Sequence, residues 1–351
     1  MVRTRHEVRI LEAGGLSFLA DSSIHLTVTS PPYPMIAMWD EIFSRLVPEA
    51  GEALGEADGH RAFEAMHSFL DTTWRGIFRS TVPGGILCVN IGDAARTLGN
   101  TFRLYPNHAR IITGCLAAGF ESLPLILWRK STNAPNKFMG SGMLPPRAYV
   151  TLEHEYILVF RKPGIRDFSG APAKSLRRES GYFWEERNLW FSDLWSLAGT
   201  RQVLTNGGGR ERSAAFPFLL PYRLIQMFSV KGDTVLDPFA GTLTTALAAL
   251  GGCRNSESVE MDGALAEASL ASMPGTADFL NGIISDRIGA HKSFITEYED
   301  ARNPCKYRNR HYRFPVVTSQ EQEIFLNPIT AIERRDRVVI AGYIPPAEST
   351  E

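Results

Sequence analysis

The chain of 351 residues is 44% hydrophobic, 21% charged and 10% aromatic, a composition that can bury a large core; its length suits one large α/β domain with a smaller module, or two modest domains. A formal net charge of −1 excludes a polycation that coats nucleic acid through bulk charge, although it permits a local basic groove. The four cysteines lack zinc-ligand spacing, no window is apolar enough to span a membrane, and residues 1–9 do not resemble a signal peptide, so we expect a cytoplasmic protein that binds no metal.

Short β-like runs alternate with longer helical ones in the first half of the chain, which predicts a largely parallel sheet flanked by helices. A proline pair stops the first predicted strand, and Gly119 closes a predicted helix. In chain order the predicted elements are a strand at 24–29, a helix at 61–80, a strand at 86–91, a helix at 105–119, and strands at about 123–128 and 155–161.

From residue 162 to about 209 the alternation fades, which indicates an inserted module. We interpret its aromatic side chains as the core of that module: Tyr182, Phe183, Trp184, Trp190, Phe191 and Trp195. The alternation then resumes with a helix at 217–229, a strand at 234–236, a helix at 242–250 and a strand at 256–259. The last part, 286–351, has weak periodicity, and we interpret it as an appendage.

A glycine-containing turn connects the predicted strand at 234–236 to the following helix. Backbone N–H groups at a helix N-terminus favour an anionic group, and Gly241 lets the backbone approach a ligand closely. Glu260 ends the next strand, where a carboxylate can accept two hydrogen bonds from a ribose diol. Tight turns with glycine are common in α/β proteins, so this turn alone is weak evidence for a cofactor. Its sequence is Asp237-Pro238-Phe239-Ala240-Gly241-Thr242-Leu243-Thr244-Thr245.

A second segment, Thr29-Ser30-Pro31-Pro32-Tyr33, follows the predicted strand at 24–29. In a purely structural interpretation the prolines stop the strand and Tyr33 is a partly buried aromatic. In a functional interpretation the rigid backbone fixes Ser30 Oγ and a nearby carbonyl as two acceptors, and Tyr33 offers a face on which a planar base stacks. Both interpretations fit this segment taken alone.

Together, the two segments resemble the motifs of amino-group DNA methyltransferases. Ser30-Pro31-Pro32-Tyr33 resembles their catalytic motif, and Asp237-Pro238-Phe239-Ala240-Gly241 resembles their cofactor loop. The catalytic motif comes first and a variable region lies between the two, which is similar to the β-class order. Further similar segments are 84–93, 127–130, 153–162 and 215–217, so the resemblance extends from about residue 20 to residue 275.

The resemblance implies a doubly wound, mostly parallel α/β sheet of the Rossmann-like type that binds S-adenosyl-L-methionine. It divides the chain into a catalytic half at 1–162, a target-recognition module at 163–212, a cofactor-binding half at 213–285 and a C-terminal extension at 286–351. The expected cofactor contacts are Asp93, Phe216, Pro217, Asp237, Pro238, Phe239, Ala240, Gly241, Thr242, Thr244 and Glu260.

The implied reaction is methylation of an exocyclic amine whose lone pair is delocalised into the ring. Ser30 and the carbonyl of Pro31 would accept hydrogen bonds from the two amino hydrogens, so that the nitrogen lone pair points at the donor methyl and placement dominates the rate. The base must be flipped out of the duplex, with Tyr33 as its stacking partner. Serine at the first motif position is typical of the cytosine-N4 branch, which makes cytosine N4 the expected target and adenine N6 the alternative.

Basic residues within and after the module are expected to contact double-stranded DNA, although a solvated surface position is the commoner role of any single arginine. These residues are Arg161, Lys162, Arg177, Arg178, Arg201 and Arg210. The basic and aromatic stretch 302–314 suits either a nucleic-acid backbone or a hairpin that packs Tyr307 and Tyr312. Asn90 and Asp93 are expected to line the pocket, and His154, between two glutamates, is interpreted as structural.

Type II restriction–modification systems are the expected setting, with a cognate restriction endonuclease as functional partner, the bacterial cytosol as location and a homodimer left open. One position departs from the family pattern. Leu243 stands where the family usually has a second glycine, and its side chain could crowd the methionine part of the cofactor. A catalytically silent DNA-binding homologue is therefore a second alternative.

Overall fold

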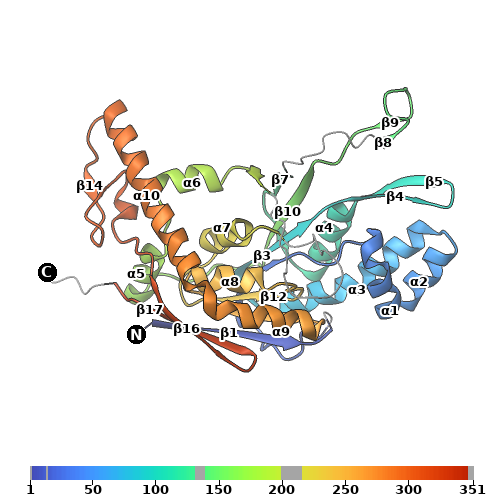
Figure 1. Ribbon diagram of the computed structural model, residues 1–351, viewed down its shortest axis with the longest axis horizontal. Coiled ribbons are helices and arrows are strands. Elements are labelled where there is room, and N and C mark those ends of the chain that lie inside the picture. Colours follow the sequence, from blue (N-terminus) through green and yellow to red (C-terminus); the bar gives the residue numbers. More distant parts are fainter. Residues whose placement is uncertain (1, 13–14, 131–138, 199–215, 347–351) are drawn as a thin grey trace.

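The computed structural model describes residues 2–12, 15–130, 139–198 and 216–346. Its main element is one mixed sheet in the order β11-β7-β10-β3-β2-β12-β13-β1-β17-β16, with β6 also paired to β10 (Figure 1). The strands in this order run in the same direction except β10 and β17, which are antiparallel to their neighbours. The predicted doubly wound, mostly parallel α/β fold is confirmed.

The central strands are β2 (Ile24–Thr29), β3 (Thr81–Ile91), β12 (Thr234–Asp237) and β13 (Asn255–Glu260). They are buried along most of their length because helices cover both faces of a parallel sheet. The outer strands are β7 (Ile126–Lys130), β10 (His154–Arg161) and β11 (Leu194–Leu197) on one side and β1 (Val2–Ile10), β17 (Val338–Tyr343) and β16 (Ile329–Arg335) on the other. The two-residue β6 is Glu121–Ser122.

Alternate side chains of each strand pack on opposite faces of the sheet, as the two-residue period of a strand requires. On one face Val28, Cys88 and Val159 pack with α7 (Leu219–Phe228) and α8 (Thr244–Gly251). On the other face Val89, Leu158 and Leu236 pack with α3 (Gly59–Ser80) and α4 (Asn107–Ala118). The helices predicted at 61–80, 105–119, 217–229 and 242–250 are thus present, with ends displaced by a few residues.

Local signals set the ends of these helices. The Asp58 carboxylate accepts a hydrogen bond from the Arg61 N–H and caps the start of α3. Gly119, with φ 109°, ends α4 in the left-handed conformation that glycine adopts without strain. The remaining helices are α1 (Asp40–Leu46), α2 (Pro48–Gly55), α5 (Ala171–Glu179), α6 (Trp184–Trp190), α9 (Gly263–Ser272) and α10 (Ala277–Ala301), with short 3₁₀ turns at Ala37–Trp39, Met273–Thr276 and Ser319–Glu321.

The C-terminal part is not an appendage, and this corrects the sequence interpretation. The boundary at 285/286 falls inside α10, and β16 and β17 extend the main sheet beside β1 (Figure 1). The N-terminal strand β1, which was not predicted, lies between β13 and β17. The C-terminal residues therefore complete the core that the N-terminal strand begins.

The described part of the module at 163–212 is also joined to the rest of the protein. Strand β11 pairs with β7 in the main sheet, and Phe183 packs with residues of α10 and of 314–326. Of the aromatic residues predicted to form a module core, Phe183, Trp190 and Trp195 are buried, whereas Trp184 and Phe191 are 39% and 40% exposed. Within 302–314, β14 (Tyr307–Arg308) pairs with β15 (Pro315–Val316), and Tyr307 and Tyr312 pack on the same cluster as Phe183, as the hairpin interpretation predicts.

Two hairpins project from the sheet at upper right in Figure 1. One is formed by β4 (Ala94–Leu98) and β5 (Thr101–Tyr105), and the other by β8 (Met139–Gly140) and β9 (Ala148–Tyr149). The rings of Phe102 and Tyr149 stack with centroids 5.0 Å apart, so the hairpins contact each other. None of the described helices is long and apolar enough to cross a membrane.

Candidate functional site

The two motif segments meet at the carboxyl edge of the sheet. Strands β2 and β12 are parallel neighbours, and the Thr29 hydroxyl donates a hydrogen bond of 2.7 Å to Asp237 Oδ1. Strand order reverses between them, since β3 lies beyond β2 and β13 beyond β12. Ligands of doubly wound proteins bind at such a reversal. Residues about two hundred positions apart in sequence therefore form one site.

Ser30 and Tyr33 lie at the start of a hydrogen-bonded network. Ser30 Oγ donates to the Tyr33 hydroxyl oxygen over 3.3 Å, and that hydroxyl donates to Glu155 Oε2 over 2.9 Å. Glu155 Oε1 also contacts the Lys130 ammonium group. Burial, and then the negative charge of Glu155, raise the pKa of Tyr33 well above its ordinary value, so the hydroxyl stays neutral.

Asn90, in β3, lies next to this network. Its amide nitrogen donates to the Tyr33 hydroxyl at 2.8 Å and to Glu155 Oε2 at 2.7 Å. Its carbonyl oxygen is buried and has no hydrogen-bond partner within the described part of the chain. Asn90 therefore offers a buried acceptor beside Tyr33, and its place in a substrate pocket stays a prediction.

Gly92 explains the close packing of the network. A Cβ atom on Gly92 would lie 3.2 Å from Tyr33 Cε2 and 3.3 Å from Glu155 Cγ. These distances are tighter than ordinary Cβ contacts, so the missing side chain lets the tyrosine ring and the carboxylate lie against the backbone. Asp93, one residue later, accepts hydrogen bonds from His108 Nδ1 and from the His108 backbone N–H at the start of α4.

The turn after β12 is organised by Asp237, whose side chain is buried. Asp237 Oδ1 accepts hydrogen bonds from Thr29 and from the Phe239 N–H. Burial raises the pKa of Asp237 to about 6, and the hydrogen bonds from Thr29, Thr245 and Phe239 oppose that shift. Pro238 and Ala240 are buried, Phe239 is half-buried, and the Thr242 and Thr244 hydroxyls are 3.1 Å apart.

Glu260 ends β13 and faces this turn. Its Oε2 accepts from the Gly241 N–H at 2.7 Å and its Oε1 from the Asp262 N–H at 2.8 Å. Gly241 has φ +49°, and a Cβ atom placed on it would meet no atom within 4 Å. The turn thus leaves open space beside the Glu260 carboxylate, an arrangement that fits the ribose and methionine parts of S-adenosyl-L-methionine.

Leu243 does not occupy this open space. Its side chain is 1% exposed and packs in a cluster with Val8, Ala266 and Leu270. Its backbone has φ 60° and ψ 26°, the left-handed conformation in which glycine is usual. The chain therefore keeps the backbone shape of a glycine at this position and uses the side chain to fill the core.

Phe216 and Pro217 lie at the start of a described segment and are both buried. Phe216 packs with residues of α7, on the face of the sheet that also carries Val28 and Cys88. Their contact with a cofactor stays a prediction.

The predicted DNA-binding residues that the structure describes lie at the edge of the sheet away from Ser30. Because β10 is antiparallel to β3, Arg161 pairs with Ile86 at the edge opposite Ser30. Its guanidinium group binds Glu121, and Lys162 Nζ donates to carbonyl oxygens of Phe78 and Thr81. Arg177 and Arg178 lie on α5, which follows an Arg166–Asp233 ion pair at the same far edge, and Arg201 and Arg210 lie outside the described residues.

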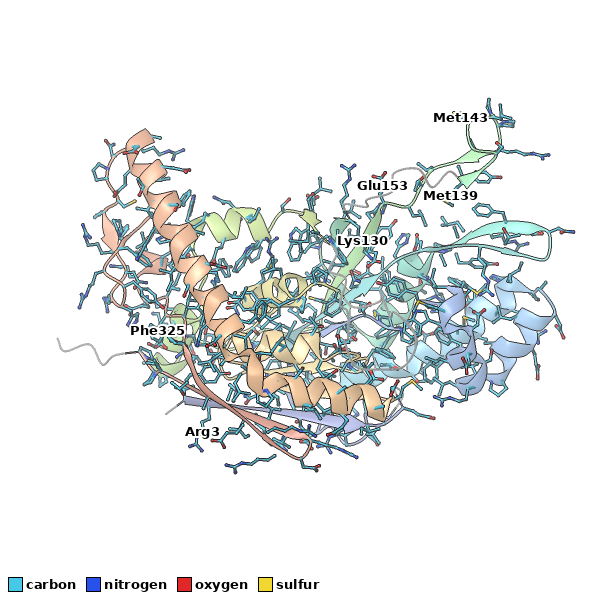
Figure 2. The ribbon with its side chains drawn as sticks, viewed as in Figure 1. Arg3, Lys130, Met139, Met143, Glu153 and Phe325 are labelled. Atoms are coloured by element: carbon cyan, nitrogen blue, oxygen red, sulfur yellow. The ribbon has the colours of Figure 1, made fainter. Side chains whose placement is uncertain are left out.

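Glu155 and Lys130 are site residues that the sequence interpretation missed. Lys130 ends β7, and Glu155 lies at the start of β10, so both reach the carboxyl edge of the sheet. Figure 2 shows Lys130 near Glu153, below the hairpin whose tip carries Met143. An acidic residue that opens an otherwise apolar strand was the available signal, because a carboxylate there needs a partner.

One cluster away from the site has metal-ligand residue types among the described residues: Glu185, His291 and Glu321. His291 Nδ1 lies 3.0 Å from Glu185 Oε1, and its Nε2 lies 3.1 Å from the Pro315 carbonyl oxygen. Glu321 accepts from the Trp184 N–H. Since these ligand atoms already have protein partners, the cluster ties α6 and α10 to the C-terminal segment.

Comparisons with known proteins point to one family. Residues 24–270 match a family model described as DNA methylase. The type II methyltransferase M.MthZI of Methanothermobacter thermautotrophicus is 48% identical over 327 residues, which cover 93% of this chain and 91% of that protein. The type II methyltransferase M.MjaI of Methanocaldococcus jannaschii is 46% identical over 275 residues, covering 75% of this chain and 89% of that one.

A solved structure agrees with these sequence relatives. The fold is similar to a putative DNA modification methylase from Thermus thermophilus that was solved in complex with S-adenosyl-L-methionine. The two share 30% sequence identity with a TM-score of 0.59, and the match covers 76% of this chain and 93% of the other.

Proposed function

The chain belongs to the DNA methylase family that its residues 24–270 match, with S-adenosyl-L-methionine as cofactor, and on that premise we propose that it methylates the exocyclic N4 amine of a cytosine in duplex DNA. The target base is extruded from the duplex into the site at Ser30, because an amine in a stacked base pair cannot reach the donor. The enzyme acts as the modification partner of a restriction endonuclease that recognises the same sequence.

The observation that carries this proposal is the contact between Thr29 and Asp237. It fixes the Ser30 corner next to the turn that ends at Gly241, so an amine held at one lies beside a methyl donor held at the other. Proximity of this kind can supply a large part of the rate enhancement in a direct transfer.

Side chains and a backbone carbonyl of the protein position the substrate amine and its base. When bound, S-adenosyl-L-methionine supplies an electrophilic methyl group. Ser30 Oγ and the Pro31 carbonyl accept hydrogen bonds from the two amino hydrogens, Pro32 holds the corner rigid, and the Tyr33 ring stacks on the base. Asp237, Gly241 and Glu260 would hold the cofactor; the two carboxylates already accept hydrogen bonds from the Phe239 and Gly241 N–H groups of the turn.

The choice of cytosine N4 rests on Ser30, since serine at this motif position is typical of that branch. Adenine N6 is the alternative, because the same two acceptors serve either amine. The burial of Leu243 in the core argues against the silent alternative, since its side chain leaves the space at Gly241 open.

The test is to incubate the protein with duplex DNA and isotope-labelled cofactor, and to identify the methylated nucleoside by mass spectrometry. We expect N4-methylcytosine. N6-methyladenine would overturn the cytosine assignment, and unmethylated duplex would overturn the enzyme assignment.

Ser30→Ala gives a sharper test of the site. We expect methyl transfer to fall by about 100-fold or more, as on loss of one oriented hydrogen-bonding group, while calorimetry shows unchanged cofactor affinity. Full activity in this variant would contradict the catalytic assignment.

A further inference from the structure

Two hydrogen bonds connect Ser30 to Glu155 through Tyr33, and both are donated in the direction of Glu155. Ser30 Oγ–H donates to Tyr33, and Tyr33 O–H donates to Glu155 Oε2. With its own hydrogen directed at Tyr33, the Ser30 oxygen is left as an acceptor. The series begins where a substrate amine would lie and ends on a carboxylate.

Amine methylation leaves an extra proton on the nitrogen, and this proton needs a path to an acceptor. The amine nitrogen forms its bond to the methyl carbon as the carbon–sulfur bond breaks, and the bonding pair stays on sulfur. The nitrogen is then positively charged and carries one proton more than the product. That proton must move to an acceptor before a neutral methylated amine can leave the site.

We propose that Glu155 is the acceptor of this proton, reached through the hydroxyl groups of Ser30 and Tyr33; the proposal rests on amine methylation at Ser30 as set out above. The proton passes from nitrogen to Ser30 Oγ, the Ser30 proton passes to the Tyr33 oxygen, and the Tyr33 proton passes to Glu155 Oε2. Both hydroxyl groups end as they began, and the net change is one proton moved from the amine to the carboxylate.

The surroundings of Glu155 suit this role. The Lys130 ammonium group contacts Oε1, and Asn90 donates to Oε2, so the carboxylate is held in place with a counter-charge beside it. The Glu155 side chain is 13% exposed, which gives the proton a route to solvent after product release. The close approach of Tyr33 and Glu155 to Gly92 restricts both side chains.

Tyr33 is suited to relaying a proton. Burial and the charge of Glu155 raise its pKa well above the ordinary value, so the phenol keeps its proton until another arrives. A network that only fixed the ring for stacking would have no need of a carboxylate at its end, and this difference can be measured.

Three variants separate the relay from a structural role. Tyr33→Phe keeps the stacking ring and removes the relay hydroxyl, and Glu155→Gln keeps the shape and removes the acceptor. Glu153→Gln is the matched control, because Glu153 is a 44% exposed glutamate two residues away, ion-paired with Arg129 as Glu155 is with Lys130.

The single-turnover methylation rate is measured against pH in H₂O and in D₂O for each protein. We expect Tyr33→Phe and Glu155→Gln to slow transfer by about 100-fold, within the range of general acid–base effects, and Glu153→Gln to match the wild type. Because Glu155→Gln removes the proton acceptor, it should change the pH profile of the rate and lose most of the solvent isotope effect. Calorimetric cofactor affinity should be unchanged throughout.

A measurement on the free protein gives an independent readout. The Tyr33 phenol is titrated by NMR of ring-labelled tyrosine, with Tyr33→Phe to assign its signal. Glu155→Gln should lower the pKa of Tyr33 toward its ordinary value because it removes a neighbouring negative charge.

Wild-type rates in Tyr33→Phe and Glu155→Gln would overturn the relay and leave the proposed function intact. Slow variants with the wild-type pH profile and isotope effect would also overturn it, in favour of a structural network. A wild-type protein unable to methylate any duplex DNA would overturn the proposed function and the relay together.

Discussion

At the scale of single residues, Asp237 is a buried carboxylate whose desolvation is only partly offset by hydrogen bonds. A carboxylate that is 2% exposed loses solvation, and the hydrogen bonds from Thr29 and the Phe239 N–H only partly compensate. The result is an acid whose pKa rises to about 6. Sequence alone identified this aspartate as part of a motif but could not show its burial.

Asp237 should therefore make stability depend on pH. Its pKa is about 6 in the folded protein and 3.8 ordinarily, so the folded state binds the proton more tightly. This contribution to stability is complete below about pH 4 and is lost as pH rises through 6, by about 3 kcal/mol in all. The Asp237→Asn variant has no titrating carboxyl group at this position, so its stability lacks this dependence on pH. Urea denaturation at pH 4 to 7 should show the variant gaining stability relative to wild type as pH rises, and a constant difference would contradict the assignment.

At Leu243 the burial of the side chain offsets a strained backbone conformation. Its left-handed backbone costs about 1–2 kcal/mol for a residue with a Cβ, and its buried side chain offsets that cost by packing in the core.

Shortening the Leu243 side chain should make the glycine variant more stable than the alanine variant, the reverse of the usual order within a helix. Leu243→Ala and Leu243→Gly both lose the buried side chain, at about 2–5 kcal/mol, but only glycine relieves the backbone strain. We expect Leu243→Gly to be more stable than Leu243→Ala by about 1 kcal/mol in chemical denaturation, with cofactor affinity retained in both. Greater stability of the alanine variant would show that the backbone is not strained.

At the scale of elements, the direction of β10 decides which charged residues reach the site. Its first residues lie beside the ends of β3 and β7, so Glu155 meets Tyr33 and Lys130, while its last residue, Arg161, lies at the far edge. The two hairpins β4–β5 and β8–β9 contact each other through Phe102 and Tyr149. They carry exposed arginines at Arg103 and Arg147.

We predict that these two arginines contact DNA phosphates, because their hairpins follow the strand ends at Ile91 and Lys130, whereas Arg161 and Arg177 lie at the far edge of the sheet. Substituting both Arg103 and Arg147 by Gln should reduce the slope of log affinity against log salt by about 2, one phosphate contact each. The matched control is the pair Arg177→Gln and Arg178→Gln on α5, which should leave the slope unchanged. A reduced slope in the α5 variant alone would show that DNA lies at the other edge.

At the scale of the whole molecule, buried polar contacts join the module, the core and the C-terminal helix. Arg287 of α10 makes two hydrogen bonds to Glu186 of α6 and one to the Tyr222 hydroxyl of α7, and both charged groups are buried. The C-terminal part then returns to the sheet through β16 and β17. The regions separated by sequence composition therefore share one core.

Breaking this ion pair should destabilise the whole fold. Glu186→Gln leaves the Arg287 charge buried without its counter-ion, at about 3–5 kcal/mol, whereas the double change Glu186→Leu with Arg287→Met should cost much less, since neither charge then remains. Denaturant unfolding should stay a single transition in both. Separate transitions for the module and the core would contradict a shared core.

The sequence by itself determined the alternation of strands and helices, the two motifs and hence the family, because each depends on residues close together in the chain. It missed α10 because the buried positions Leu280, Ile284, Arg287, His291 and Ile295 have helical spacing but include two polar residues. Only the tertiary structure decided strand direction, and with it the arrival of Glu155 at Tyr33 and the placement of Arg161 at the far edge. It also decided that Leu243 fills the core. Strand pairing and burial are set by contacts between distant segments, and local propensity does not encode them.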